Sequence, residues 1–358
     1  MTGASTYLML CSLLAVALVW LLPRERGLDA VAALSLLAIA IISPESALWL
    51  AGTTLATVLT IRHFKAENHR GAVVLGLAVV FVALLFATRE MSALFWIGGA
   101  YFTLRHIHVL VDWWMGRLSI PTTGEYLRYS LFLPVIMAGP IHRLEHFQRQ
   151  ARRQRLSAVN FFSGAERALF GLALAVVISS WALRRLRLVV QQHTGDWPQF
   201  GQHWVECAFD WLQMYFSFAG LTSLALGLAL MMGLRLEENF NRPWAARNLI
   251  DFWSRWHMTL SGWCRDYVFH PLTAVTRLPI VGLLAAMLAM GLWHDNSAYY
   301  VLWAVWQSLG IYLTHRALRL PAGLLPAVAT RFIGWFSVLA WLSLTKPVVM
   351  LVLEVIGS

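Results

Sequence analysis

Charge is scarce in this 358-residue sequence, because only 13% of its residues are charged, against about a quarter in soluble domains. Its three cysteines are unpaired in number and far apart, so they give neither a disulfide framework nor a zinc-binding spacing. The sequence also lacks a Gly-rich phosphate loop, an H-E-x-x-H pair and a G-x-S-x-G elbow. These absences argue against nucleotide hydrolysis, a zinc peptidase and a serine hydrolase.

Hydrophobic residues, by contrast, make up 59% of the chain, so water is not its main solvent. Crossing about 30 Å of hydrocarbon takes about 20 helical residues, and apolar runs of roughly that length recur along the sequence. No small-residue cleavage site follows the first run, so we expect it to be retained as a span and not removed as a signal peptide. The sequence therefore predicts an all-α fold, a polytopic transmembrane helical bundle. The predicted spans are 6–22, 28–43, 46–61, 71–88, 91–111, 159–183, 204–233, 279–293, 297–318 and 328–354.

The formal net charge of +10 comes from basic residues in short segments between the apolar runs. Examples are Arg24 to Arg26, Arg62 to Arg70 and Arg143 to Arg155. This pattern indicates cytoplasmic loops and argues against nucleic-acid binding. It places the N-terminus outside, and a single crossing at 159–183 then puts three arginines outside as well. Either that segment re-enters the membrane or these arginines reach the interface from a helix end. They are Arg184, Arg185 and Arg187.

We expect one integral membrane domain over residues 1–358. Two stretches, 121–145 and 237–272, are too polar or too interrupted to be simple spans. Irregular backbone at membrane depth is tolerated only where protein or a water-filled cavity covers it, so these stretches are where we expect a site. Within the domain we expect N-terminal spans (1–111), a cytoplasmic or re-entrant loop (112–158), a catalytic core (159–318) and a C-terminal span (319–358).

The stretch 237–272 is the densest polar and aromatic part of the chain. On a helix, a polar stripe of four residues three and four apart would run beside an aromatic stripe. Asp251 and Arg255 would form an i, i+4 pair. The alternative reading is an interfacial helix whose Trp side chains anchor at headgroups and whose arginines touch phosphate. The polar stripe consists of Ser254, His257, Ser261 and Arg265.

His294 stands where one apolar run stops and another begins, and residues that favour helix N-caps follow it. We expect it in a turn beside the N-terminus of the next helix, where a neutral imidazole is favoured. An ionisable residue at membrane depth is a functional candidate, although a histidine merely hydrogen-bonded at a loop mouth fits too. Elsewhere, only His108 and Asp112 could bind the same metal ion, and we predict no metal site. Six histidines in polar loops are expected to be solvated: His63, His69, His142, His146, His193 and His203.

Three blocks of sequence, from Phe132 to Arg143, from Glu238 to Val268 and from Met290 to His294, resemble the membrane-bound O-acyltransferase superfamily. The similarity is to its bacterial branch, which includes alginate O-acetyltransferase and the D-alanyl transferase of teichoic acids. The blocks read FLPVIMAGPIHR, ENFNRPW leading into FWSRWHMTLSGWCRDYV, and MGLWH. The chain departs from this branch at Ser217 and Ser223, where relatives commonly have Asp, and at Asp295, where Gly is usual.

The resemblance implies that His294 is the active-site histidine of the family and that His257 is its second histidine. It also implies a ring of tilted helices with re-entrant segments around a thin centre. A thioester donor would enter from the cytoplasm, and a hydroxyl acceptor from the opposite side or from the bilayer. Candidate substrate-binding residues are Trp256, Ser261, Arg265, Trp293, Asn241, Arg255, Gly139, Pro140 and Arg143.

From these features we expect a membrane O-acyltransferase in the bacterial cytoplasmic membrane, with several spans and no permanently bound cofactor. The donor would be an acyl-carrier protein with its phosphopantetheine thioester, or an acyl-CoA such as acetyl-CoA. The acyl group would be acetyl or D-alanyl, and the acceptor a cell-envelope glycopolymer or a lipid-linked molecule. A periplasmic partner acyltransferase would fit this scheme. The alternatives are a transporter or flippase for lipid-linked sugars and a non-catalytic envelope-assembly scaffold.

Overall fold

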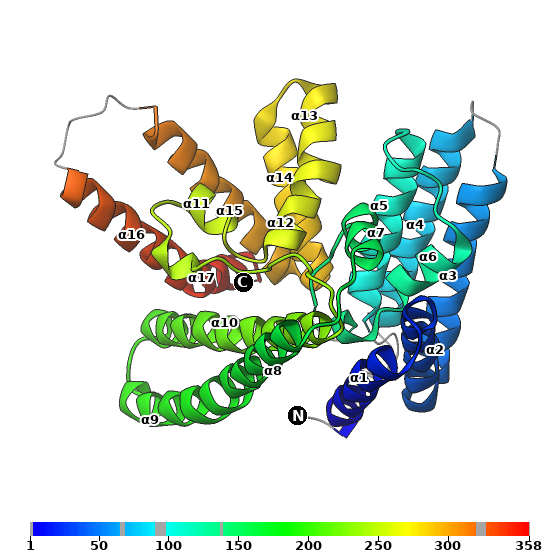
Figure 1. The fold of residues 1–358 in the computed structure, drawn as a ribbon. Coiled ribbons are helices and arrows are strands. Elements are labelled where there is room, and N and C mark those ends of the chain that lie inside the picture. Colours follow the sequence, from blue (N-terminus) through cyan, green and yellow to red (C-terminus); the bar gives the residue numbers. More distant parts are fainter. Residues whose placement is uncertain (1–2, 65–68, 90–97, 137–138, 320–326, 358) are drawn as a thin grey trace. The chain divides into compact units, whose positions relative to one another are not determined.

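The computed structural model describes residues 3–64, 69–89, 98–136, 139–319 and 327–357. These residues form helices and irregular segments, with no strand among them, which confirms the predicted all-α fold (Figure 1). The chain divides into two compact units, Met1–Leu172 with Leu221–Glu237, and Ala173–Gly220 with Glu238–Ser358. Each unit is described in turn, and the expected single membrane domain stays a prediction.

The first unit consists of the N-terminal helices, two short helices in the polar stretch near residues 121–145, and parts of two long helices. Local signals in the sequence set several of its boundaries. The Ser43 side chain accepts a hydrogen bond from the Ser46 N–H, and Thr122 forms a reciprocal capping box with Glu125. The elements are α1 (Gly3–Leu21), α2 (Arg24–Ile42), α3 (Pro44–His63), α4 (Arg70–Arg89), α5 (Gly99–Trp114), α6 (Thr123–Ser130), η2 (Leu133–Val135), α7 (Leu144–Arg152) and α8 (Ala158–Ala173).

The second unit holds the predicted catalytic stretch, which is broken into short pieces between longer apolar helices. Its longest helix, α10 (Gln199–Met231), continues into the first unit. The other elements are η3 (Leu174–Leu183), α9 (Arg184–Thr194), η4 (Pro243–Ala245), α11 (Leu249–Trp253), α12 (Met258–Cys264), η5 (Arg265–Phe269), α13 (His270–Thr276), α14 (Pro279–His294), α15 (Ala298–Ala317), α16 (Ala327–Ser343) and α17 (Thr345–Gly357).

Among the described residues, three helices are long and apolar enough to cross a membrane: Arg70–Ala87, Ala158–Thr194 and Gln199–Met231. The bent pair Arg331–Ser343 and Thr345–Gly357 makes a fourth if it counts as one span. All four fall within predicted spans or extend them. The other predicted runs that the structure describes also form helices, but those helices are shorter or more polar than this test requires.

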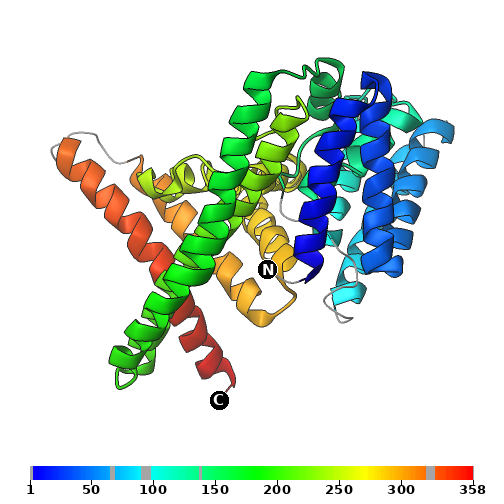
Figure 2. The same cartoon turned by 60° about the horizontal axis from the view of Figure 1, so that its bottom comes forward.

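The helix Ala158–Thr194 runs without a break through α8, η3 and α9 (Figure 2). Its 37 residues span about 55 Å at 1.5 Å per residue, well beyond about 30 Å of hydrocarbon. The arginines at 184, 185 and 187 therefore follow the apolar part on the same helix. The helix is long enough to cross a membrane and extend past it, and the choice between such a crossing and a re-entrant segment stays a prediction.

Two glycines bring α8 and α10 into main-chain contact within the first unit. A Cβ added at Gly164 would lie 2.6 Å from the Gly227 carbonyl oxygen, and one added at Gly227 would lie 2.5 Å from the Gly164 oxygen. No real Cβ tolerates such distances. Helix packing inside membranes relies on small residues of this kind, because they let backbones approach closely.

The first unit also contains a buried network of polar side chains centred on Tyr129. Its hydroxyl donates to the His142 carbonyl oxygen at 2.9 Å and lies 2.8 Å from His108 Nε2. His108 Nδ1 lies 3.3 Å from the Asp112 carboxylate, and Arg105 donates to the Tyr129 carbonyl. His142 is 0% exposed, so the expectation of a solvated side chain there was wrong.

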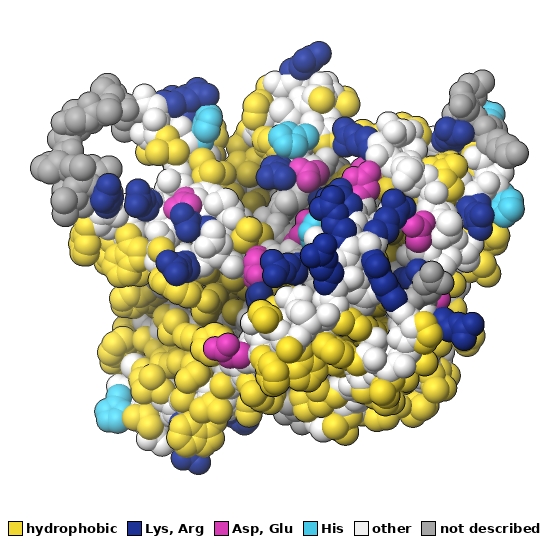
Figure 3. Space-filling model, in the orientation of Figure 1, with side chains coloured by type: hydrophobic (Ala, Val, Ile, Leu, Met, Phe, Trp, Pro, Cys, Tyr) yellow, Lys and Arg dark blue, Asp and Glu magenta, His cyan; other side chains and the backbone are white. Residues whose placement is uncertain are grey.

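Apolar side chains cover much of the visible surface, shown in yellow in Figure 3. On α4 these exposed side chains include Leu75, Val79 and Val80, at 66%, 58% and 49% exposure. Large exposed apolar faces are unfavourable in water and are expected where lipid covers a protein. The surface therefore agrees with the apolar composition, and the chain is an integral membrane protein.

Candidate functional site

The backbone turns sharply at His257, between α11 and α12. Its φ of 41° and ψ of 53° are left-handed, a conformation that is strained for a residue with a side chain. The single continuous helix with one polar stripe that we predicted over this stretch is therefore wrong, because α11 ends at Trp253 and α12 starts at Met258. Strained backbone of this kind is concentrated at functional sites.

Two backbone hydrogen bonds from an upstream loop hold this turn in place. The Asn241 N–H donates to the Arg255 carbonyl oxygen at 2.9 Å, and the Met258 N–H donates to the Asn239 carbonyl oxygen at 2.8 Å. The Thr259 hydroxyl also donates to the side-chain oxygen of Asn239, which is fully buried. Sequence reasoning did not single out Asn239, which we interpret as a positioning residue for His257.

The His257 ring lies between two aromatic side chains and is only 3% exposed. Its centroid is 4.6 Å from that of Phe218 and 5.7 Å from that of Trp293. Neither ring nitrogen has a hydrogen-bond partner among the described residues. His257 belongs to a turn outside the candidate spans, and burial, with a smaller contribution from His294, lowers its pKa well below the usual value. The ring is therefore neutral near pH 7.

His294 is the last residue of α14, and α15 begins four residues later, at Ala298. The structure thus places it at a helix end and not in the connecting turn, although its ring does lie beside the start of the next helix. It stacks on Tyr300 with centroids 5.6 Å apart and an interplanar angle of 14°. The Trp293 ring contacts both histidine rings, and its centroid lies 4.8 Å from that of His294. Unlike His257, His294 is exposed.

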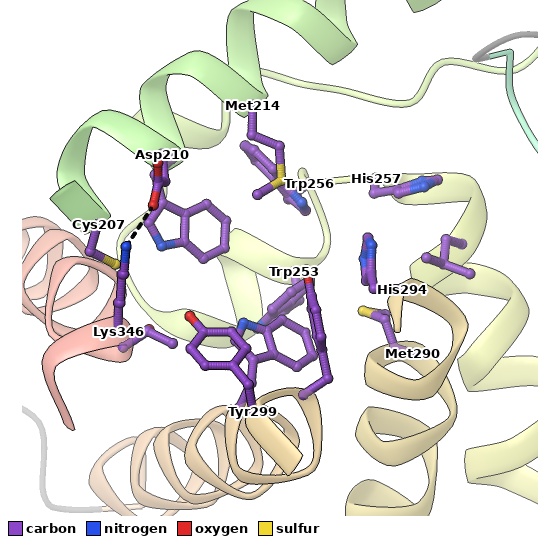
Figure 4. A pocket seen from close by; sticks show the side chains of 15 residues that line it. Cys207, Asp210, Met214, Trp253, Trp256, His257, Met290, His294, Tyr299 and Lys346 are labelled. Carbon is purple, nitrogen blue, oxygen red and sulfur yellow. Dashed lines mark ion pairs between the residues drawn. The ribbon is translucent and has the colours of Figure 1, made fainter. Parts of the chain in front are cut away.

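Both histidines line one cavity of about 80 Å³ within the second unit (Figure 4). Aromatic residues make up much of its wall, and one lysine and one aspartate add charge. The Trp253 indole N–H, which is buried, also has no hydrogen-bond partner among the described residues. The cavity thus presents unpaired polar groups that a bound molecule would satisfy. Its lining residues are Cys207, Asp210, Trp211, Met214, Trp253, Trp256, His257, Leu260, Met290, His294, Tyr299, Tyr300, Trp303, Thr345 and Lys346.

Of the other predicted site residues in this unit, Trp256 is in the cavity wall. Ser261 donates to the Trp256 carbonyl oxygen at 3.0 Å. Arg255 forms the predicted ion pair with Asp251, at 2.6 Å, which confirms the i, i+4 spacing. Arg265 pairs with its neighbour Asp266 at 2.9 Å and is not among the lining residues. Gly139, Pro140 and Arg143 belong to the first unit, and their substrate-binding roles stay predictions.

Sequence reasoning missed the charged part of the wall, Asp210 and Lys346. Each interrupts an apolar run of the sequence, and an ionisable residue in such a run marks a functional candidate. That signal was present, but the pairing of residues 136 positions apart could not be read from spacing. Ser217, where the chain departs from its relatives, is not among the lining residues.

The three blocks of sequence from Phe132 to His294 lie within the region that matches a known family. A family model described as "MBOAT, membrane-bound O-acyltransferase family" matches residues 115–344. The chain is 30% identical over 247 residues to the teichoic acid D-alanyltransferase of Streptococcus thermophilus, covering 64% of this chain and 59% of that protein. It is 31% identical over 234 residues to the probable alginate O-acetylase AlgI of Pseudomonas aeruginosa, covering 63% of this chain and 44% of the relative.

A third relative is the peptidoglycan O-acetyltransferase of Helicobacter pylori, 29% identical over 220 residues that cover 56% of this chain and 40% of that protein. The matches therefore span between two fifths and three fifths of these relatives' own length. The family match itself includes both candidate histidines and covers well over half of the chain. This chain belongs to the membrane-bound O-acyltransferase family.

Proposed function

We propose that this protein transfers an acyl group from a thioester donor to a hydroxyl of a cell-envelope glycopolymer or a similar acceptor. The observation that carries the proposal is the presence of His257 and His294 in one cavity, with both ring nitrogens of His257 buried and unpaired. The family and the names of the relatives support it. The setting would be the bacterial cytoplasmic membrane, with several spans.

In the proposed reaction His294 accepts the proton of the acceptor hydroxyl while the oxygen attacks the thioester carbonyl carbon. The carbon–sulfur bond then breaks, and the thiolate takes up the proton from His294 as the ester is released. General-base assistance of this kind contributes about 10²–10⁴ in rate. His294 suits this role because its ring is exposed to the cavity.

His257 would stabilise the oxyanion that forms during the attack. A neutral imidazole carries one N–H donor, and this one has no partner among the described residues. A fixed donor in a dry site stabilises developing negative charge, because it needs little reorganisation. The left-handed backbone and the bonds from the Asn239 loop hold the ring in place.

We expect the transferred acyl group to be short, since the relatives' names mention alanyl and acetyl groups.

The donor would approach the basic segment around α7. Its arginines Arg149 and Arg152 have side chains 58% and 68% exposed, and Arg153 and Arg155 are exposed too. Arginine-rich surfaces attract phosphates and acidic proteins, so coenzyme A and an acidic acyl-carrier protein both fit. Gly139, Pro140 and Arg143 precede this segment in sequence, and we propose that they contact the donor.

The test is acyl transfer by the purified full chain in lipid nanodiscs, with acetyl-CoA and acyl-loaded carrier protein as alternative donors. We expect His294→Ala to lower turnover by about 10²–10⁴-fold and His257→Ala to lower it by a similar factor. The matched control is His193→Ala, because His193 is an exposed residue of α9 that is not part of the cavity wall.

The thermal unfolding of each variant should match that of the wild-type protein, so that lost turnover is not lost folding. Wild-type turnover in His294→Ala would show that this residue is not the base. A wild-type protein that consumes no thioester with either donor, but moves a lipid-linked sugar across a vesicle membrane, would replace the enzyme proposal with a transporter.

A further inference from the structure

A cluster of four charged side chains joins the cavity wall to α9 and α10 within the second unit. Lys346 Nζ lies 2.6 Å from the Glu206 carboxylate and 3.6 Å from that of Asp210. Arg187 donates to the Asp210 carboxylate at 2.7 Å. Asp210 and Lys346 line the same cavity as the two histidines, and their labelled side chains are joined by a dashed line in Figure 4. Their side chains are 41% and 24% exposed, so they can meet a ligand.

The charges in the cluster balance, since two cations face two carboxylates and each cation is already paired. A phosphate would meet no net positive charge here. A neutral hydroxyl group, by contrast, can donate to a carboxylate and accept from an ammonium group at the same time, and hydrogen bonds to charged partners contribute about 1.5–3 kcal/mol.

Aromatic rings line the same cavity as the charged pair: Trp211 from α10, and Tyr299 and Trp303 from α15. The C–H faces of a sugar ring or polyol pack on such rings while their hydroxyls bond to neighbouring polar groups. The buried Trp253 N–H and the His257 ring nitrogens lack partners among the described residues and line the same space. Aromatic faces, balanced charges and unpaired polar atoms together define a site for a hydroxyl-rich molecule.

We propose that Asp210 and Lys346, with the Tyr299 ring, form the acceptor subsite, which binds a neutral sugar or polyol segment and directs one hydroxyl toward His294. This inference rests on the proposed function and specifies its acceptor side. Asp210 and Lys346 bind and orient the acceptor, whereas the proton transfer belongs to the histidines.

Saturation-transfer NMR on the full chain in nanodiscs tests this subsite, with cellobiose as a neutral probe and glycerol 3-phosphate as an anionic probe. The wild-type protein should bind cellobiose more tightly than glycerol 3-phosphate. Asp210→Asn should weaken cellobiose binding about ten-fold or more, as expected for one lost hydrogen bond to a charged group. Tyr299→Leu should weaken it too without changing any charge. Asp196→Asn, an exposed carboxylate in the turn before α10, is the control and should bind like wild type.

His294→Ala separates this inference from the proposed function, because it should lower acyl transfer by about 10²–10⁴-fold while cellobiose binding still depends on Asp210. The inference is overturned if wild type does not bind cellobiose, if it prefers glycerol 3-phosphate, or if both Asp210→Asn and Tyr299→Leu bind cellobiose like wild type. If binding depends on Asp210 but no thioester is ever consumed, the proposed function fails and the subsite remains.

Discussion

The left-handed backbone at His257 leads to a prediction about stability that reverses the usual order of glycine and alanine. We compare His257→Gly with His257→Ala. Both variants lose the imidazole ring and its contacts with Phe218 and Trp293, so these losses cancel in the comparison. The remaining difference is the backbone, which has φ 41° and ψ 53°.

An alanine in this conformation costs about 1–2 kcal/mol that a glycine does not. Glycine also has more freedom in the unfolded chain, which offsets part of this gain by about 0.4–1 kcal/mol. We therefore expect His257→Gly to be more stable than His257→Ala by about 1 kcal/mol. In an ordinary helix the order is the opposite, because glycine is about 1 kcal/mol less favourable than alanine there.

The assay is reversible unfolding in mixed micelles by titration with sodium dodecyl sulfate, followed by tryptophan fluorescence. Ala274→Gly is the control for the ordinary order, since Ala274 is exposed within α13, and it should lower the free energy of unfolding by about 1 kcal/mol. Equal stability of the two variants at position 257, or a more stable alanine variant, would refute the claim that the turn is left-handed in the membrane.

Two further predictions concern the first unit. Tyr129→Phe removes the hydroxyl that joins His142 and His108, and we expect it to lower the free energy of unfolding by about 1–3 kcal/mol. The control is Tyr312→Phe, at an exposed site of α15, which should change the free energy of unfolding little. Equal effects of the two variants would contradict a role of the buried network. Burial raises the pKa of Glu125, but hydrogen bonds from Arg152 and Thr122 outweigh this effect and hold the pKa below its usual value. The ionised carboxylate therefore stabilises the fold above about pH 4.3. This stabilisation is lost as the pH falls through the lowered pKa. Glu125→Gln should therefore destabilise the protein at pH 7 and have no effect at a pH below the lowered pKa, and a pH-independent difference between the two proteins would contradict this linkage.

The sequence predicted helix locations well, because hydrophobic runs and capping residues are local signals. Thus the run 71–88 appears as the candidate span Arg70–Ala87. The sidedness of the spans stays a prediction, since the length of the helix through Arg184 does not say which of its ends faces the cytoplasm. The run 46–61 forms α3 but is not counted among the candidate spans. Three of its four threonines, Thr53, Thr54 and Thr57, are buried against the rest of the protein, so they lower the hydropathy of this helix without exposing polar groups to lipid.

The errors came where distant contacts decide the local structure. No glycine or proline marks the stretch from Ser254 to His257, so the pattern predicted a helix. The bonds from the Asn239 loop stabilise a turn there instead. His142 lies two residues after Pro140 and directly before Arg143, in what reads as a polar loop. It becomes buried because α5 and α6 supply partners for it.

The contact between Gly164 and Gly227 has a consequence for how this family member can evolve. Elsewhere along α8 and α10, a lipid-facing leucine can become a valine or a phenylalanine with little effect, since lipid tails adapt to any shape. At these two positions even one extra methyl group would wedge the helices apart, because the carbonyl oxygen of one residue already occupies the space beside the other. We therefore expect most positions of these two helices to tolerate substitution, whereas Gly164 and Gly227 should remain glycine.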